Sequence, residues 1–124
     1  METDYAIRIA WFLAAHGRRA QKRELGRTMR LYDFQLCAIL PMLQETGLIA
    51  ADEDELLLLR PPDKLPLLDI VNAVEGNIEI SRCLAQDKFC SLGVAESCPL
   101  RRVYLEIQGS IEHRLKNEYI KDLI

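Results

Sequence analysis

The amino-acid sequence predicts a mainly α-helical fold with a small β-hairpin: a winged helix-turn-helix followed by a long C-terminal dimerisation helix. Three observations lead to this prediction. Three helical segments come first, and a tight turn separates the second from the third, as in a helix-turn-helix. Two short apolar segments around a polar tip follow, which is typical of a hairpin. The last helical segment carries one apolar stripe along its length. A chain of 124 residues, 49% of them hydrophobic, fits one compact domain with an extension.

The first predicted helix covers residues 3–16. Thr3 is a favourable N-cap residue, and Gly17 suits the C-terminal stop. Ile9, Phe12 and most other side chains of the segment are apolar. We therefore expect this helix to be largely buried.

The second and third helices, predicted near 21–28 and 32–46, form the helix-turn-helix. The third has apolar residues at core spacing between Leu36 and Leu43, and it ends at Gly47. Against one acid, six basic residues lie within thirteen positions: Arg18, Arg19, Lys22, Arg23, Arg27 and Arg30. Such a run is often only a solvated face. Its place on a helix-turn-helix favours contacts with nucleic-acid phosphates.

Residues 48–51 and 56–59 are predicted to form the two strands of the wing. Between them lie four consecutive acids at 52–55, which a phosphate backbone would repel. Pro66 then begins, and Gly76 ends, a predicted helix over 67–75.

The last long helix begins at Pro99. Its apolar stripe at helical spacing consists of Leu100, Val103, Tyr104, Ile107, Ile111 and Leu115. A domain of this size has little core left for so long a stripe, so we interpret it as a homodimer interface rather than a second core wall. Gly109 costs about 1 kcal/mol in a helix relative to alanine, and it would let a partner helix approach closely.

Three cysteines, Cys83, Cys90 and Cys98, lie in a short polar stretch before this helix, spaced C-x6-C and C-x7-C. The spacing is too wide for the paired C-x2-C of a structural zinc site. Three thiolates suit an iron–sulfur cluster that takes one further ligand from elsewhere. Alternatively they are unrelated cysteines, some buried as small apolar residues. Cys37, on the third helix, is predicted to pack among core residues.

The net charge of −3 argues weakly against nucleic acid, although the basic run shows how uneven the charge is. The acidic N-terminus lacks the features of a signal peptide, and its apolar stretch is too short to cross a membrane. We expect a cytoplasmic protein in which thiols stay reduced. No nucleophile–base pair or phosphate loop is present, so neither an enzyme nor a small-molecule substrate is expected.

Several stretches of the chain together form a recognisable pattern: Asp-Tyr-Ala-Ile-Arg at 4–8, Ile-Leu at 39–40, Gly-Leu-Ile at 47–49, Arg-Pro-Pro at 60–62, Leu-Leu-Asp-Ile-Val-Asn-Ala-Val-Glu-Gly at 67–76, the three cysteines, and Ile-Lys-Asp-Leu at 120–123. Through them the sequence resembles, nearly end to end, the IscR/NsrR-type (Rrf-type) winged-helix iron–sulfur transcriptional regulators of bacteria. The resemblance implies a homodimer joined through the long helix. It also implies an iron–sulfur cluster near the interface, whose state controls binding to promoter DNA in response to nitric oxide, redox stress or iron status.

The chain departs from that family's pattern in three places. Arg101 stands where IscR-like members have a histidine ligand. Asp4 matches the aspartate that NsrR-like members supply from the other subunit, which favours a [4Fe–4S] cluster, with [2Fe–2S] possible. Asp4 can equally be an ordinary acid at a helix start. The wing is short and lacks the family's Arg-Gly and glycine run.

These observations predict a winged helix-turn-helix at 1–76, a cluster-binding loop at 77–98, and a dimerisation helix with its tail at 99–124. The expected function is a DNA-binding repressor, with phosphate contacts from the six basic residues and base contacts from the start of the third helix, where Arg30, Tyr32, Asp33 and Gln35 are available. Tyr32 can instead pack within the domain. Two alternatives are a cluster-free thiol switch and a family member that acts through a protein partner.

Overall fold

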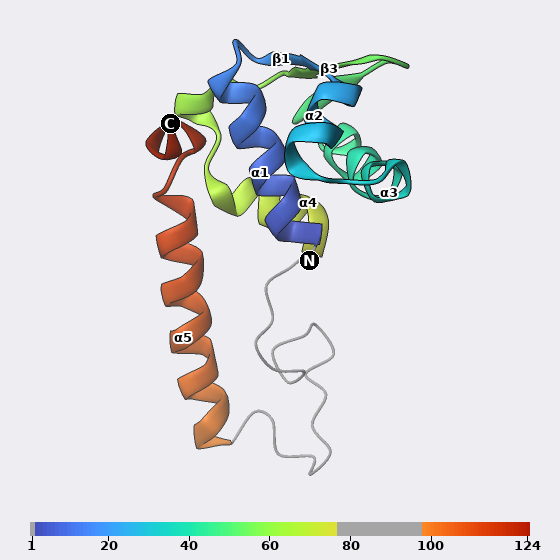
Figure 1. Cartoon of the computed structure of the whole chain (residues 1–124). Coiled ribbons are helices and arrows are strands. Elements are labelled where there is room, and N and C mark those ends of the chain that lie inside the picture. The colour runs from blue at the N-terminus through green and yellow to red at the C-terminus, as the bar shows by residue number, and fades with distance from the viewer. Residues whose placement is uncertain (1, 77–97) are drawn as a thin grey trace.

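The computed structural model describes residues 2–76 and 98–124 (Figure 1). The helices are α1 (Glu2–Ala15), α2 (Lys22–Met29), α3 (Asp33–Glu45), α4 (Leu67–Glu75) and α5 (Pro99–Lys116), with 3-10 turns η1 (Pro62–Lys64) and η3 (Ile120–Leu123). The strands are β1 (Arg19–Gln21), β2 (Ile49–Ala51) and β3 (Glu55–Leu58). The predicted fold class is confirmed: a mostly helical chain with a small antiparallel sheet arranged as a winged helix.

The sheet has three strands in the order β1-β3-β2, one more than the sequence predicts. Strand β1 is antiparallel to β3, with the buried Ala20 opposite Leu56. On the other side of β3, Ile49 of β2 faces Leu58. Strand β1 has three residues and a single apolar side chain, so it gives no alternating pattern, and its partner strand determines its conformation.

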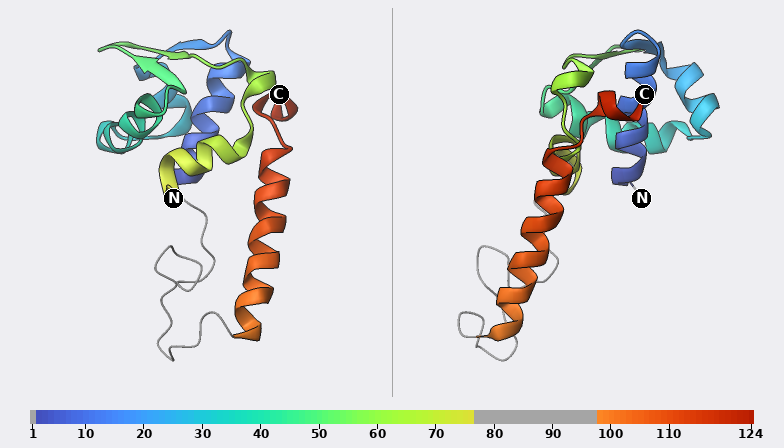
Figure 2. Two further views of the ribbon diagram at one scale, coloured as in Figure 1. Left: turned by 180° about the vertical axis from the view of Figure 1, so that it is seen from behind. Right: turned by 90° about the vertical axis from the view of Figure 1, so that its left-hand side faces the viewer.

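The core lies where α1, α3 and α4 meet beneath the sheet, which closes one end of the helical part (Figures 1 and 2). Helix α1 runs through its centre and buries Ile9 and Leu13 completely. Ile39 and Leu43 of α3 and Ile70 of α4 complete the same cluster. The first helix, expected to be largely buried, is buried along one face, whereas Trp11 is 44% exposed.

The connection from the wing to α4 is held by Arg60. Its guanidinium bonds the Asp69 carboxylate in the first turn of α4 and also donates to the Lys64 carbonyl at 2.6 Å. Helix α4 itself has the predicted boundaries, because Pro66 precedes it and Gly76, at φ +80°, ends it.

Helix α5 projects from the winged helix on the side away from α2 and α3 (Figures 1 and 2). It contacts α4, yet none of its residues is buried. Four apolar side chains at helical spacing stay exposed: Leu100, Val103, Ile107 and Ile111. Tyr104 and Leu115, which belong to the same predicted stripe, are half-buried. No described helix is both long and apolar enough to span a bilayer.

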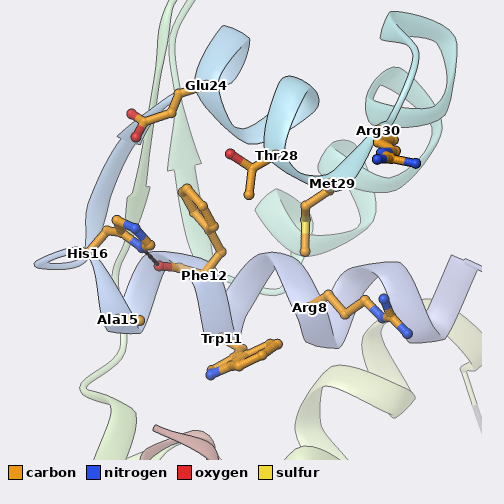
Figure 3. Close-up of a pocket in the computed structure, with 9 residues that line it drawn as sticks. All are labelled: Arg8, Trp11, Phe12, Ala15, His16, Glu24, Thr28, Met29 and Arg30. Carbon is orange, nitrogen blue, oxygen red and sulfur yellow. Dashed lines mark hydrogen bonds between the residues drawn. The ribbon is translucent and has the colours of Figure 1, made fainter.

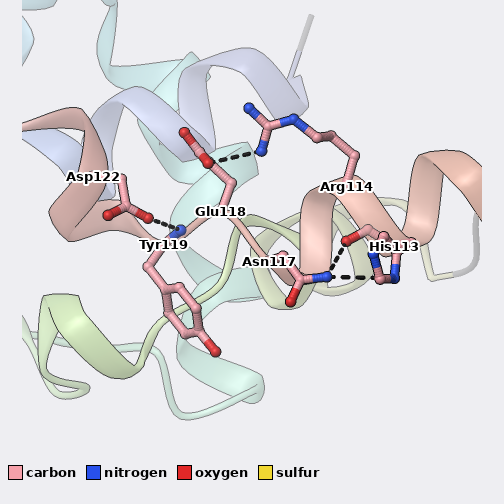
Figure 4. Close-up of polar contacts among 6 residues, drawn as sticks. All are labelled: His113, Arg114, Asn117, Glu118, Tyr119 and Asp122. Atoms are coloured by element: carbon pink, nitrogen blue, oxygen red, sulfur yellow. Dashed lines mark hydrogen bonds and ion pairs between the residues drawn. The ribbon is translucent and has the colours of Figure 1, made fainter.

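After α5 the chain turns back into the winged helix (Figure 4). Asn117 ends α5 by donating its side-chain amide to the His113 carbonyl at 2.7 Å, and Arg114 pairs with Glu118 at 2.7 Å. The backbone N–H of Leu67 then donates to the Glu118 carbonyl, and that of Ile120 to the Leu65 carbonyl, at 2.8 and 2.9 Å.

The tail contributes directly to the core, because Ile120 is 0% exposed within the main hydrophobic cluster. A segment that we grouped with the dimerisation helix from its place in the sequence thus packs as part of the winged helix.

Candidate nucleic-acid interface and cysteine sites

The turn between α2 and α3 places the two helices of the helix-turn-helix. Arg30 ends α2 in the left-handed conformation, at φ 55°, and the next N–H, of Leu31, donates to the Gly26 carbonyl at 2.9 Å. A Cβ at Gly26 would lie 3.3 Å from the Leu31 carbonyl oxygen. Glycine at this position therefore lets the chain turn tightly back over α2.

An exposed arginine stripe along α2 and at its C-terminal end contains three of the predicted phosphate-binding residues. Arg23 and Arg27 are four residues apart and share a face of the helix, and Arg30 follows as the left-handed residue that ends it. All three side chains are exposed. Lys22 is half-buried at the start of α2, and its backbone N–H donates to the Asp54 carbonyl of the wing at 2.8 Å.

The two arginines that precede α2 are engaged within the fold. The Arg18 guanidinium donates to the Leu58 carbonyl at 3.2 and 3.0 Å and to the Leu59 carbonyl at 2.8 Å. It thereby fastens the turn after α1 to the end of β3. Arg19 lies 3.9 Å from the Glu55 carboxylate across the β1–β3 pair. The Nε and Nη2 groups of Arg18 therefore bond the protein backbone rather than a phosphate.

The start of α3, where base contacts are predicted, is strongly exposed. Tyr32 is 70% exposed, so the alternative that it packs in the core is wrong. Its ring stacks instead on that of Phe34, with centroids 5.8 Å apart and planes 8° from parallel. Gln35 is half-buried, and its side-chain oxygen accepts from the Tyr32 N–H at 2.8 Å as a helix cap. That bond uses one of the two lone pairs of the oxygen with which Gln35 would read adenine, and it holds the side chain against the start of the helix.

Two surface residues of α3 were not anticipated from the sequence. Phe34 is 71% exposed. Cys37 is exposed as well, so the prediction that it packs in the core is wrong. The core of α3 is formed by Leu36, Ile39 and residues farther along. Each successive residue turns about 100° around a helix, so Cys37, directly after Leu36, lies off that buried face.

The wing tip is acidic, as predicted, and its first carboxylate, Asp52, is bonded to the backbone of the tip. The Asp52 carboxylate accepts the N–H groups of Glu55 and Asp54, at 2.6 and 2.8 Å. These backbone hydrogen bonds, with smaller contributions from Lys22 and Arg19, lower the pKa of Asp52 below its ordinary value. The tip therefore places negative charge next to the first turn of α2.

A groove of about 510 Å³ separates α1 from α2 (Figure 3). Its lining combines apolar side chains, among them Trp11 and Met29, with Arg8 and Arg30. His16 stacks on Phe12 with ring centroids 4.0 Å apart, and its Nδ1 lies 2.8 Å from the Phe12 carbonyl oxygen. His16 lies directly after the last residue of α1.

Of the four predicted cluster ligands, Cys83 and Cys90 lie outside the described residues. Cys98 is a free, half-exposed thiol directly before α5. Asp4 is exposed in the first turn of α1 and pairs with Arg8 at 3.1 Å. No group of three possible metal ligands occurs within 2–76 and 98–124.

The first turn of α1, which contains Asp4, and the start of α5, which follows Cys98, are separated in the single chain (Figures 1 and 2). The first turn of α1 rests against the end of α4, where the Thr3 hydroxyl bonds the Glu75 carboxylate. The start of α5 lies far from that point, at the end of the projecting helix (Figures 1 and 2). Within one subunit the described fold therefore keeps these two predicted ligands apart.

The whole chain, residues 1–124, matches the family described as Rrf2, iron-dependent transcriptional regulator. Similar solved structures include Bacillus subtilis CymR, described as the global cysteine regulator. It is 20% identical with a TM-score of 0.77, covering 99% of this chain and 92% of that one. The oxidised form of Staphylococcus aureus CymR is 16% identical with a TM-score of 0.74, over 99% and 92% of the two chains.

T. potens IscR is 18% identical with a TM-score of 0.73, covering 99% of this chain and 82% of that one. At these identities the similarity concerns the fold. No match was found among curated protein sequences. The family match over the entire length, together with a winged helix shared with CymR and IscR, leads to one conclusion: the chain belongs to the Rrf2 family of transcriptional regulators.

Proposed function

We propose that this protein is a homodimeric repressor that binds promoter DNA and is controlled by an iron–sulfur cluster that senses nitric oxide, redox or iron status. The observation that carries the proposal is the exposed arginine stripe of α2, Arg23, Arg27 and Arg30, next to the exposed start of α3. In a helix-turn-helix the second helix enters the major groove while neighbouring residues contact the backbone. The α2 stripe would supply those phosphate contacts.

The dimer is proposed from the surface of α5. Its apolar stripe is exposed in one chain, with Ile107 44% accessible. If the α5 stripes of two protomers packed against each other, both stripes would be buried in a symmetric interface. The space around Gly109 agrees with this arrangement, since a Cβ there would meet nothing within 4 Å in the single chain.

The cluster would be held by Cys83, Cys90 and Cys98, with Asp4 from the other subunit. Three thiolates and one carboxylate suit iron, with [4Fe–4S] favoured and [2Fe–2S] possible. The described part of the site fits this assignment, because Cys98 is a free thiol and the Asp4 carboxylate is accessible. A bound cluster would supply the redox and nitric oxide chemistry. Asp4 reaches a partner's cluster only if it leaves its ion pair with Arg8.

The second candidate function is a cluster-free thiol switch. It is favoured by the free, half-exposed thiol of Cys98, which is accessible to an oxidant. In that mechanism Cys83, Cys90 or Cys98 would itself be oxidised reversibly. The acidic wing also keeps open a role exerted through a protein partner, with weak DNA binding of its own.

The deciding experiment is purification without oxygen, followed by an absorption spectrum and iron and sulfide analysis. We expect a brown, dimeric protein, and we expect Cys90→Ala to yield none of the colour. If the wild-type protein were colourless and bound DNA only before its thiols were oxidised, the thiol-switch function would replace the cluster-controlled one. A wild type that binds no duplex in either state would leave the protein-partner role.

A further inference from the structure

The exposed face of α3 carries no cation, and its middle part is apolar, with the exposed Asp33 at one end of the helix and the exposed Gln44 and Glu45 at the other. The residues that face solvent at helical spacing are Phe34, Cys37, Ala38 and Pro41. The helix sequence, Asp-Phe-Gln-Leu-Cys-Ala-Ile-Leu-Pro-Met-Leu-Gln-Glu, contains no lysine, arginine, histidine or asparagine. The Gln35 side-chain oxygen accepts the hydrogen bond from the Tyr32 N–H that caps the helix. Helix α3 therefore lacks the donors that arginine and lysine present to guanine.

Thymine is the base that offers an apolar group in the major groove, its C5-methyl, and apolar side chains such as alanine and phenylalanine contact it. Asp33, exposed at the start of α3, adds an acceptor. A carboxylate is repelled by the two acceptors of guanine and can take a hydrogen bond from the amino group of adenine or cytosine. The acceptor excludes guanine but does not separate adenine from cytosine, so the preference for A·T pairs rests on the contact with the thymine methyl group.

We infer that α3 recognises its DNA site through thymine methyl groups, with Phe34 and Ala38 as the specificity-determining residues. This inference rests on the proposed DNA-binding function and names the sequence class that it selects: half-sites rich in A·T pairs where they face α3. Tyr32 stacks on Phe34 at an angle of 8° and so holds the ring in one orientation on the helix surface.

Charge complementarity makes DNA the occupant of this face. Arg23, Arg27 and Arg30 are exposed on the adjoining helix α2, where they match the phosphates that flank a major groove. The acids of the wing tip lie beside the first turn of α2, and there they act against non-specific binding. Because this repulsion weakens the contacts with phosphates, contacts with the bases must provide a larger part of the binding free energy.

The test removes methyl groups from the DNA without altering its base pairing. Full-length protein purified without oxygen selects duplexes from a random-sequence pool, and the strongest duplex is then remade with uracil in place of thymine. We expect A·T-rich half-sites, and binding about fourfold weaker for each contacted methyl group removed, as for the loss of one buried carbon.

Two variants locate the effect. Phe34→Ala should bind the thymine duplex more weakly and should lose most of the difference between thymine and uracil duplexes. Since Phe34 is 71% exposed, the substitution should leave folding intact. The matched control, Arg23→Ala, should weaken binding to both duplexes by one factor and preserve their ratio.

Equal affinity for thymine and uracil duplexes, or selection of G·C-rich half-sites, would overturn methyl recognition while leaving DNA binding in place. A thymine–uracil ratio that survives Phe34→Ala would remove Phe34 from the assignment. Failure to enrich any duplex would overturn DNA binding itself, and this face would then belong to a protein partner.

Discussion

Replacing Ile120 with alanine should destabilise the winged helix, although this residue lies in the C-terminal tail, 44 positions beyond the end of the predicted DNA-binding domain at residue 76. Ile120 is completely buried, in one cluster with Leu65 and Ile70. Truncating a fully buried isoleucine to alanine costs about 2–5 kcal/mol, through lost apolar burial and the cavity left behind. For a chain of this size that corresponds to roughly 8–20 °C in Tm.

Thermal unfolding followed by circular dichroism, at one fixed protomer concentration, measures this effect. Ile124→Ala is a matched control in the same tail, because Ile124 is 64% exposed and its truncation should change stability by less than about 0.5 kcal/mol. If both variants melted with the wild type, the tail would not belong to the core, and the packing described for it would be refuted.

Three further predictions concern association, DNA and the cluster. Ile107→Glu places a charge on the exposed α5 stripe and should cost several kcal/mol of association; a dimer that persisted in sedimentation would show that another surface pairs. Arg23→Ala with Arg27→Ala should flatten the salt dependence of duplex binding at unchanged Tm. Arg18→Ala should lower the Tm and leave the salt dependence of duplex binding unchanged, because it loses hydrogen bonds to the Leu58 and Leu59 carbonyls. Asp4→Ala should keep the dimer and speed cluster loss in air; unchanged cluster lifetime would leave Asp4 a helix-start acid.

Elements with clear boundary signals were predictable from the sequence. Helix α4 begins after Pro66 and ends before Gly76, as expected, because both residues act locally. Strand β1 was not predictable. It consists of three residues within a basic run, and its conformation comes from pairing with β3, more than thirty positions away.

The candidate DNA surface was predictable in part. The exposed arginines of α2 follow from composition and helical spacing. The engagement of Arg18 with carbonyls at the end of β3 does not, because those partners lie forty positions away. Phe34 and Cys37 were within reach of the sequence. If Leu36, Ile39 and Leu43 are placed on the buried face of α3, positions 34, 37, 38 and 41 fall on the exposed face. Their residues are apolar, and for that reason the sequence alone predicts that Cys37 packs in the core.

The return of the tail to the core has a mechanical consequence. The segment after α5 is joined to the winged helix by the buried Ile120 and by backbone hydrogen bonds to Leu65 and Leu67. In the proposed dimer, a change in the angle at which the two α5 helices cross would reach each winged helix through this connection and through the contact between α5 and α4. The distance between the two α3 helices would then depend on that angle. A base pair inserted between the half-sites of an operator would rotate one of them by about a tenth of a helical turn, and the dimer would have to change the crossing angle to follow that rotation.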